Sequence, residues 1–183
     1  MSRSSFSLPR RAMSAGELSH LLVRLLGVTA LASALACLFA AHLLWNLTPS
    51  LPLGLYWLTR GAPAPLAKQG VLVAFAVPAA VGDLVRERHY LPPGALLVKT
   101  VVATAGDRVC TEGGALTVNG KGLGAILTED TAGRPLPHYE GCGAVPDGWL
   151  YVASHYVKSF DSRTFGPIRV SDIRAGVTPL WTY

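Results

Sequence analysis

One long apolar segment constrains this chain more than any other feature. From Leu21 to Trp45 the sequence is predominantly apolar, and its ionisable side chains of note are Arg24 near the start and His42 near the end. At about 1.5 Å of rise per residue, a helix of this length crosses a hydrocarbon core of about 30 Å. The sequence therefore predicts three parts: a tail over residues 1–18, a transmembrane anchor over residues 19–45 and a domain over residues 46–183.

Basic residues are concentrated before this segment. The arginines before residue 25 are Arg3, Arg10, Arg11 and Arg24, against the single acidic residue Glu17, whereas from residue 46 onward 12 basic residues accompany 10 acidic ones. Positive residues that flank an apolar span stay on the cytoplasmic side. We therefore expect a cytoplasmic N-terminus and an exported domain. Nucleic-acid binding would need a basic patch on the folded part, so nucleic acid is not an expected partner.

A cleaved secretory signal is the competing interpretation of the apolar segment. Two arginines precede it and Ala-rich triplets lie within it, as in signal peptides. The run is long for the apolar core of a signal, and cleavage after it would leave Ser50 close to a new N-terminus. We therefore favour the uncleaved anchor.

Beyond residue 46 the pattern changes to short apolar runs separated by Gly and Pro, which favours a mostly β domain. Segments of strand length are Val71–Val77, Leu96–Ala103, Ala115–Lys121 and Trp149–Ala153. The Asn119-Gly120 pair is a two-residue hairpin signal. No stretch in this part has the period and length of a helix, so the predicted fold class is a mostly β domain preceded by one transmembrane helix.

The three cysteines fit an exported domain. Cys37 lies in the apolar segment, where it behaves as an apolar residue. Cys110 and Cys142 are the two cysteines of the outer part, and oxidising conditions there favour a disulfide between them. Two unpaired buried thiols are the alternative.

A single serine lies between two prolines just after the apolar segment, in Thr48-Pro49-Ser50-Leu51-Pro52. Proline fixes its own φ and pushes the preceding residue into extended geometry. Ser50 is therefore expected on a stiff, non-helical arm close to the membrane. This placement suits a nucleophile, while serine beside proline is also ordinary turn chemistry, and both interpretations remain open at this point.

The second candidate is Lys99, within the apolar run Leu96–Ala103. With a period of two, Leu97, Lys99 and Val101 share one face of a strand, and both faces around the lysine are apolar. Burial of an ammonium lowers its pKa from about 10.4, and a neutral lysine can take a proton from a serine. The alternative is an edge-strand lysine that guards against aggregation.

A third stretch runs from Ser159 to Ile168 and contains Asp161 and Arg163. In an extended segment these two side chains share a face, because they are two positions apart. An ion pair between them would fix a turn, which by itself is a structural feature.

Together the three stretches resemble signal peptidase I, the membrane-bound Ser/Lys endopeptidase family, and in particular its conjugative-transfer branch, the TraF signal peptidases. The serine box of that branch, Ser-x-Pro-x-Gly-x-Tyr, is matched by Ser50, Pro52, Gly54 and Tyr56. The lysine box is matched by Lys99 with Gly106 and Asp107. The last box, Ser-x-Asp-Ser-Arg-x-x-Gly, is matched by Ser159, Asp161, Ser162, Arg163 and Gly166.

The resemblance implies roles for these residues. Ser50 would attack the scissile carbonyl and Lys99 would be the general base. The oxyanion hole would be formed by the Ser50 backbone N–H and the Thr48 hydroxyl. The supporting residues would be Ser159, which hydrogen-bonds the Lys99 amine, and Asp161 and Arg163, which brace the site.

Two departures from the family pattern stand out. Ala153–Lys158 replaces the usual Gly-Asp-Asn before the last box. The segment from Asp107 to Trp149 is also short compared with the housekeeping enzymes, which carry a second β domain there.

The resemblance further implies an enzyme without a cofactor, in the inner membrane of a bacterium, with its catalytic domain in the periplasm. Its partners would be the lipid bilayer and a membrane-anchored preprotein, in this branch a pilin precursor. In the conjugation branch the acyl-enzyme can be attacked by the pilin's own N-terminal amine, which gives a cyclic subunit. The alternatives are a catalytically silent scaffold for pilus assembly and a housekeeping signal peptidase of broad specificity.

A metal site is a minor alternative. His138, Glu140 and Cys142 alternate along the chain and could share one face of a strand. The sequence has no second pair of ligands at a recognised spacing, so no metal is predicted.

Overall fold

The computed structural model describes residues 14–183. Arg3, Arg10 and Arg11, on which the predicted topology partly depends, lie outside the described residues. The chain separates into two compact units, one up to Ala41 and one from His42 to Tyr183. In chain order the elements are α1 (Ala15–Ala40), β1 (Leu43–Asn46), β2 (Gly54–Thr59), the 3-10 helix η1 (Ala64–Leu66), β3 (Leu72–Ala76), α2 (Ala79–Glu87), β4 (Leu96–Ala103), β5 (Arg108–Glu112), β6 (Ala115–Val118), β7 (Lys121–Ala125), β8 (Cys142–Ala144), β9 (Trp149–Ala153), α3 (Ser162–Phe165), β10 (Ile168–Arg169), the 3-10 helix η2 (Val170–Asp172) and β11 (Ile173–Thr182).

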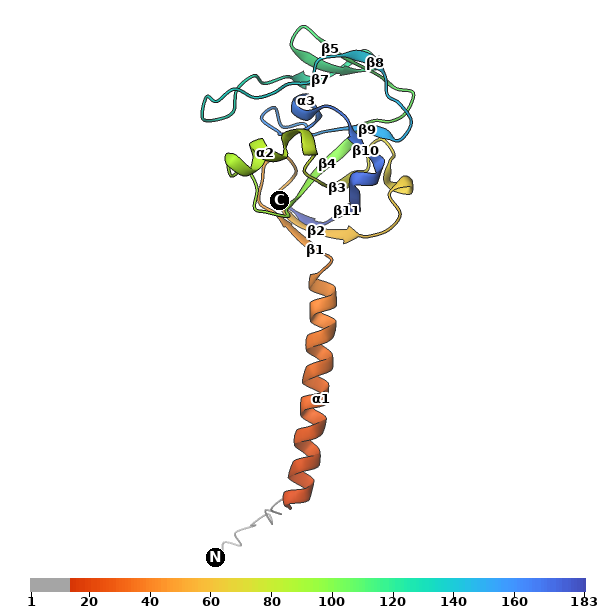
Figure 1. Cartoon of the computed structure of the whole chain (residues 1–183). Coiled ribbons are helices and arrows are strands. Elements are labelled where there is room, and N and C mark those ends of the chain that lie inside the picture. Colours follow the sequence, from red (N-terminus) through yellow and green to blue (C-terminus); the bar gives the residue numbers. More distant parts are fainter. Residues whose placement is uncertain (1–13) are drawn as a thin grey trace, which may run out of the picture. The chain divides into compact units, whose positions relative to one another are not determined.

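Helix α1 is the N-terminal unit (Figure 1). It begins with a capping box, in which the Ser14 hydroxyl accepts from the Glu17 N–H and the Glu17 carboxylate accepts from the Ser14 N–H. None of its 26 residues is buried, although the helix is almost entirely apolar. Its length and composition suffice to cross a membrane. The structure therefore has the expected apolar helix near the N-terminus.

The helix ends earlier than the apolar segment. The segment was expected to run to Trp45 as one span, but the helix stops at Ala40 and Leu43–Asn46 forms β1. The reason is strand pairing: Trp45 lies opposite Leu55 of β2 in an antiparallel ladder. The apolar residues at this end therefore belong to the second unit.

A seven-stranded sheet carries the candidate site, in the order β1-β2-β11-β3-β4-β9-β10. β11 lies between β2 and β3 and is antiparallel to both. One core cluster of this sheet consists of Val73, Phe75, Leu97, Val101, Leu150, Val152, Ile168 and Ile173. Because β4 lies between β3 and β9, its inward side chains are surrounded by apolar neighbours.

A four-stranded sheet, in the order β7-β6-β5-β8, forms from the segment between Asp107 and Trp149. It lies at one end of the domain in Figure 1. Asn119 and Gly120 form its tight turn with φ values of 50° and 79°, as the hairpin signal predicts. Cys110 and Cys142 lie opposite each other on β5 and β8 and form a disulfide. The segment that was expected to be short therefore still folds into a sheet of its own.

The fold is mostly β, which confirms the predicted fold class. The strands at Leu96–Ala103 and Trp149–Ala153 have the predicted bounds. The expectation of no helix after residue 46 is wrong, since α2 and α3 lie there. α2 buries only Val81 and Val85, and one buried pair at a spacing of four residues gives too weak a period for detection.

Candidate active site

Lys99 lies at the centre of the site, and the strand pattern explains its burial. In β4 the residues Leu97, Lys99, Val101 and Ala103 are buried and the alternate residues are not. Lys99 is 4% exposed, and its ladder partner on β3 is Val73. The strand therefore directs the ammonium group into the apolar interior, as its alternation predicts.

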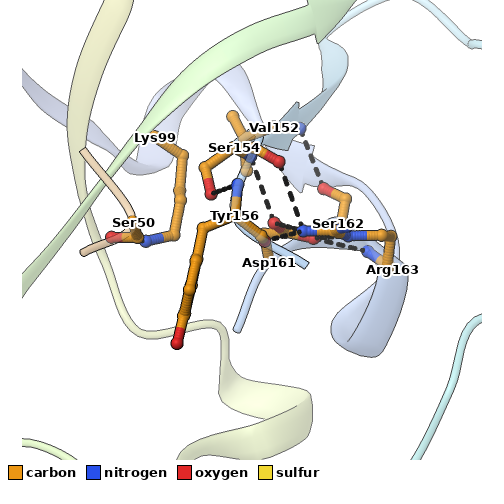
Figure 2. Close-up of polar contacts among 8 residues, drawn as sticks. All are labelled: Ser50, Lys99, Val152, Ser154, Tyr156, Asp161, Ser162 and Arg163. Carbon is orange, nitrogen blue, oxygen red and sulfur yellow. Dashed lines mark hydrogen bonds and ion pairs between the residues drawn. The ribbon is translucent and has the colours of Figure 1, made fainter. Parts of the chain in front are cut away.

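The Lys99 amine contacts the Ser50 hydroxyl. Lys99 Nζ lies 2.9 Å from Ser50 Oγ, and Figure 2 shows the lysine side chain pointing at the serine. Two residues 49 positions apart in sequence thus meet at hydrogen-bonding distance. This distance is within the reach that a general base needs.

Burial lowers the pKa of Lys99 from 10.5 to about 8. Two charges modify this shift: the Asp161 carboxylate raises the pKa of Lys99, and the Arg163 guanidinium lowers it. These charges oppose each other, so desolvation sets the direction. With this pKa, about one amine in ten is neutral at pH 7, and proton abstraction requires that neutral form.

Ser50 lies in the loop between β1 and β2, and the other residues of the serine box shape this loop. Tyr56 is buried and donates its hydroxyl to the Pro52 carbonyl at 2.7 Å. Gly54 has φ of 145°, and a Cβ there would collide with the Trp181 backbone. The proline, glycine and tyrosine of the box thus determine the path of the loop that carries the serine.

Thr48, the predicted oxyanion-hole residue, lies beside the serine. Its Oγ1 is 3.3 Å from Ser50 Oγ. Its hydroxyl donates to Asn46 Oδ1 at 2.8 Å, so in this structure the proton is directed at Asn46. A role in the oxyanion hole would require the Thr48 side chain to rotate.

Asp161 and Arg163 form a fully buried ion pair on the other side of Lys99 from Ser50 in Figure 2. Arg163 Nη2 lies 2.7 Å from Asp161 Oδ2 and also donates to the carbonyls of Ser154 and Tyr156. The Ser154 N–H in turn donates to Asp161. The pair therefore fixes the backbone of Ser154 and Tyr156, in the segment that follows β9.

Ser162 also bonds to the backbone of β9. Its hydroxyl accepts from the Val152 N–H at 2.9 Å. Val152 belongs to β9, and β9 pairs with β4 at Thr100 and Val101. The last box thus supports the strand next to Lys99.

Ser159 differs from the expectation. It is buried, but its Oγ has no hydrogen-bond partner among the described residues, so the expected hydrogen bond to Lys99 is absent. The Ser159 N–H bonds to the Tyr156 carbonyl in a turn, and the residue lines a cavity of about 440 Å³ with Phe160 and Arg163. This turn explains why Ser159 is buried next to the site without a bond to the amine.

The structure also bears on the metal alternative. The Cys142 sulfur is bonded to Cys110, and His138 Nε2 lies 2.9 Å from Glu140 Oε1. These three side chains therefore have other partners and do not form the ligand set that their alternation suggested.

Sequence reasoning missed two residues that organise the site, Asn46 and Ser154. Asn46 lies four positions before Ser50, and its side-chain amide bonds to the loop that follows. An asparagine just before a proline-rich turn is a known signal for side-chain to backbone bonds. Ser154 gives no comparable signal, because its role depends on the distant Asp161 and Arg163.

A family model and several relatives match most of this chain. The family model for signal peptidase, peptidase S26, matches residues 16–181. A plasmid transfer protein TraF of Escherichia coli is 35% identical over 156 residues, which cover 79% of this chain and 85% of that protein. A probable conjugal transfer protein TraF of Sinorhizobium fredii is 35% identical over 159 residues, which cover 75% and 76% respectively. A crystal structure of a signal peptidase I from Enterococcus faecalis V583 is similar at a TM-score of 0.37 and 20% identity, and covers 61% of this chain and 96% of that one.

Proposed function

The chain belongs to the signal peptidase family, peptidase S26, and from that premise we propose that it is a Ser/Lys endopeptidase that processes preproteins for conjugative transfer, with pilin precursors as its substrates. The observation that carries the proposal is the 2.9 Å contact between Lys99 Nζ and Ser50 Oγ, with the lysine buried. An exposed lysine would be protonated and unable to accept the serine proton.

In the proposed mechanism the neutral Lys99 amine accepts the Ser50 hydroxyl proton as the serine oxygen attacks the scissile carbonyl. The Ser50 N–H and the rotated Thr48 hydroxyl stabilise the oxyanion. Lys99 then returns the proton to the leaving amine, and an acyl-enzyme remains on Ser50. Asp161 and Arg163 hold the backbone beside the lysine and touch no reacting atom.

The acyl-enzyme has two possible acceptors. Attack by water releases a trimmed protein with a free carboxylate. Attack by the amine at the substrate's own N-terminus releases a cyclic product, which is lighter by one water molecule. We propose cyclisation as the second reaction of the same intermediate, as the resemblance to the conjugative-transfer branch implies.

The proposed orientation places the N-terminus in the cytoplasm and residues from His42 onward outside the inner membrane. It is supported by the arginines before the apolar helix and by a helix long and apolar enough to cross a membrane. The substrate then reaches Ser50 from the same membrane, since only nine residues separate the end of α1 at Ala40 from Ser50.

The test is co-expression of the full chain with a conjugative pilin precursor. Ser50→Ala and Lys99→Ala should each leave the precursor uncleaved, while both proteins accumulate in the membrane at wild-type levels. Normal processing with either variant would instead favour a silent scaffold. Efficient cleavage of a panel of unrelated preproteins would favour a housekeeping enzyme, and the mass of the mature pilin distinguishes trimming from cyclisation.

A further inference from the structure

Asn46 makes an unusually complete set of contacts with the loop that carries Ser50. Its Nδ2 lies 3.0 Å from the Thr48 carbonyl, 3.1 Å from that of Leu51 and 3.0 Å from that of Pro52. Its Oδ1 accepts from the Thr48 N–H at 3.2 Å and from the Thr48 hydroxyl at 2.8 Å. Both ends of one side-chain amide are therefore used within residues 48–52.

The loop needs such a partner because of its own sequence. Pro49 and Pro52 have no backbone N–H, so the loop has few donors for its own carbonyl groups. Asn46 is the last residue of β1 and pairs with Gly54, the first of β2. The two strands thus anchor the ends of the loop, and within it the Asn46 amide adds donors and an acceptor to the bond that Tyr56 donates to the Pro52 carbonyl.

The same amide determines how Thr48 faces the serine. A side-chain amide oxygen is only an acceptor, so the hydroxyl proton of Thr48 must be directed at Asn46. The lone pairs of Thr48 Oγ1 are then left towards Ser50 Oγ, 3.3 Å away. The orientation of the hydroxyl next to the nucleophile is therefore coupled to Asn46.

We propose that Asn46 is a positioning residue for the nucleophile: its amide holds residues 47–53 in the shape that keeps Ser50 Oγ against Lys99 Nζ. The inference rests on the proposed Ser/Lys mechanism. Asn46 itself contacts neither the amine nor, among the described contacts, the serine hydroxyl. A displacement of about 1 Å at a reacting atom lowers a rate by about 100-fold, and this is the size of effect expected here.

The experiment uses the full chain in detergent. The substrate is a fluorescence-quenched peptide that spans the cleavage site of the pilin precursor, as located from the mass of the mature pilin. Asn46→Ala removes all five contacts. Asn46→Asp keeps the shape and the acceptor oxygen but removes the two N–H groups that the three carbonyls share. For each we expect kcat to fall about 100-fold while KM changes no more than about threefold.

The matched control is Asn119→Ala. The Asn119 amide accepts from the Arg108 N–H and donates to Asp107, both at 2.8 Å, in the four-stranded sheet. This substitution also removes an asparagine that bonds at both ends and has φ of 50°, so it should lower the melting temperature. We expect its kcat to stay within about twofold of wild type, because it touches no part of the loop.

A pH profile separates positioning from structural damage. The groups that act on Lys99 are Asp161, Arg163 and Ser50; all remain in Asn46→Ala, which adds no charge, whereas Asn46→Asp adds a carboxylate that would itself raise the pKa of Lys99. In Asn46→Ala the midpoint of kcat/KM against pH should therefore stay at the wild-type value while the plateau falls. A midpoint that moves up towards that of an ordinary lysine would show that the variant exposes Lys99, and would overturn the positioning role.

Wild-type kcat in Asn46→Ala, or in Asn46→Asp if the alanine variant does not fold, would also overturn the inference. Neither result affects the proposed function, which Ser50→Ala tests on the same peptide. Cleavage by Ser50→Ala would remove the nucleophile itself and, with it, the proposed function.

Discussion

In the seven-stranded sheet and the segment that follows β9, buried positions include ionisable and hydroxyl side chains, whereas in the four-stranded sheet they are apolar or disulfide-bonded. The buried polar residues of the described chain are Lys99, Ser154, Ser159, Asp161, Ser162, Arg163 and Thr164. The buried cluster against the smaller sheet consists of Val109, Leu116 and Val118 from that sheet, Val145 next to it, and Ala103 and Tyr151 from the larger sheet. The larger sheet and the segment after β9 therefore bury charged and hydroxyl groups, whose burial opposes folding. The smaller sheet buries apolar groups and a disulfide, which stabilise the domain.

This difference is the one expected if the proposed active site lies in the first region. A buried amine and a buried ion pair both oppose folding unless their surroundings compensate. A disulfide and a tight Asn-Gly turn carry no such penalty. The contrast predicts that substitutions in the first region separate activity from stability, and that substitutions in the second region change stability alone.

The largest expected effect is that of Lys99→Met, which removes the proposed base. Processing should fall by about 10⁴-fold or more. Because burial lowers the pKa of Lys99 from 10.5 to about 8, the unfolded state binds the proton more tightly, and at pH 7 the lysine destabilises the fold. The methionine should therefore raise the free energy of unfolding, by up to about 3 kcal/mol.

Denaturant unfolding and a processing assay at pH 7 measure both quantities. Lys121→Met is the control, since Lys121 is exposed on β7, and it should change neither. A Lys99→Met protein that is less stable than wild type would show that the amine is stabilised in the fold, and would weaken the contrast between the two regions.

Next in size is Arg163→Met, which leaves the Asp161 carboxylate buried and unpaired. Breaking a buried pair by removal of one partner destabilises by about 3–5 kcal/mol, and we expect processing to fall with it at 37 °C. The double variant Asp161→Leu/Arg163→Met removes both charges and should recover a large part of the lost stability. Equal stability of the single and double variants would mean that the pair is not the source of the loss.

The disulfide should have a similar or smaller effect, and on stability alone. Cys110 and Cys142 are 32 positions apart, and a loop of that length gives a stabilisation of roughly 3–4 kcal/mol in the chain-entropy model. Cys110→Ala/Cys142→Ala should lower the melting temperature but leave the rate of processing unchanged at a temperature where the protein is folded. A large loss of rate in the folded double variant would connect the smaller sheet to the site and break the comparison. Cys37→Ala in α1 serves as the control.

The smallest effect is a gradual dependence of kcat/KM on pH in the wild-type protein. If the neutral amine is the base, as proposed, kcat/KM should rise about tenfold per pH unit below the pKa of Lys99, and level off above about 8. Initial rates on the quenched peptide between pH 5 and pH 10 would record this. A midpoint near 6.5 would instead indicate a histidine as the base.

The sequence was informative where a local pattern determines a structure. The alternation around Lys99 predicts both the strand and the burial of the lysine, and Asn119-Gly120 predicts the turn. β11 was not predicted, because Gly176 and Pro179 interrupt its apolar pattern and its place depends on pairing with both β2 and β3. The end of the apolar helix was also misplaced, since the ladder between β1 and β2 is a contact between separate segments.

The residues of the candidate site likewise divide into those that sequence motifs predicted and those that they did not. Ser50, Lys99, Asp161 and Arg163 were proposed from motifs, and the structure brings the first two within 2.9 Å. The expected bond from Ser159 to Lys99 is absent, and no pattern in the sequence reports the direction of a side chain at the end of a turn. Asn46 was missed because its importance comes from the carbonyl groups around it and not from its own spacing.

The position of β11 also has a consequence for the timing of assembly. Ser50 and Lys99 leave the ribosome well before Ile173–Thr182, and yet this late strand separates β2 from β3 and contacts the Gly54 turn through Trp181. The nascent chain therefore carries Ser50 and Lys99 before the sheet that holds them together is complete. Under the proposed mechanism, this order would keep the dyad unassembled during synthesis, when the unfolded chain itself would be the nearest substrate.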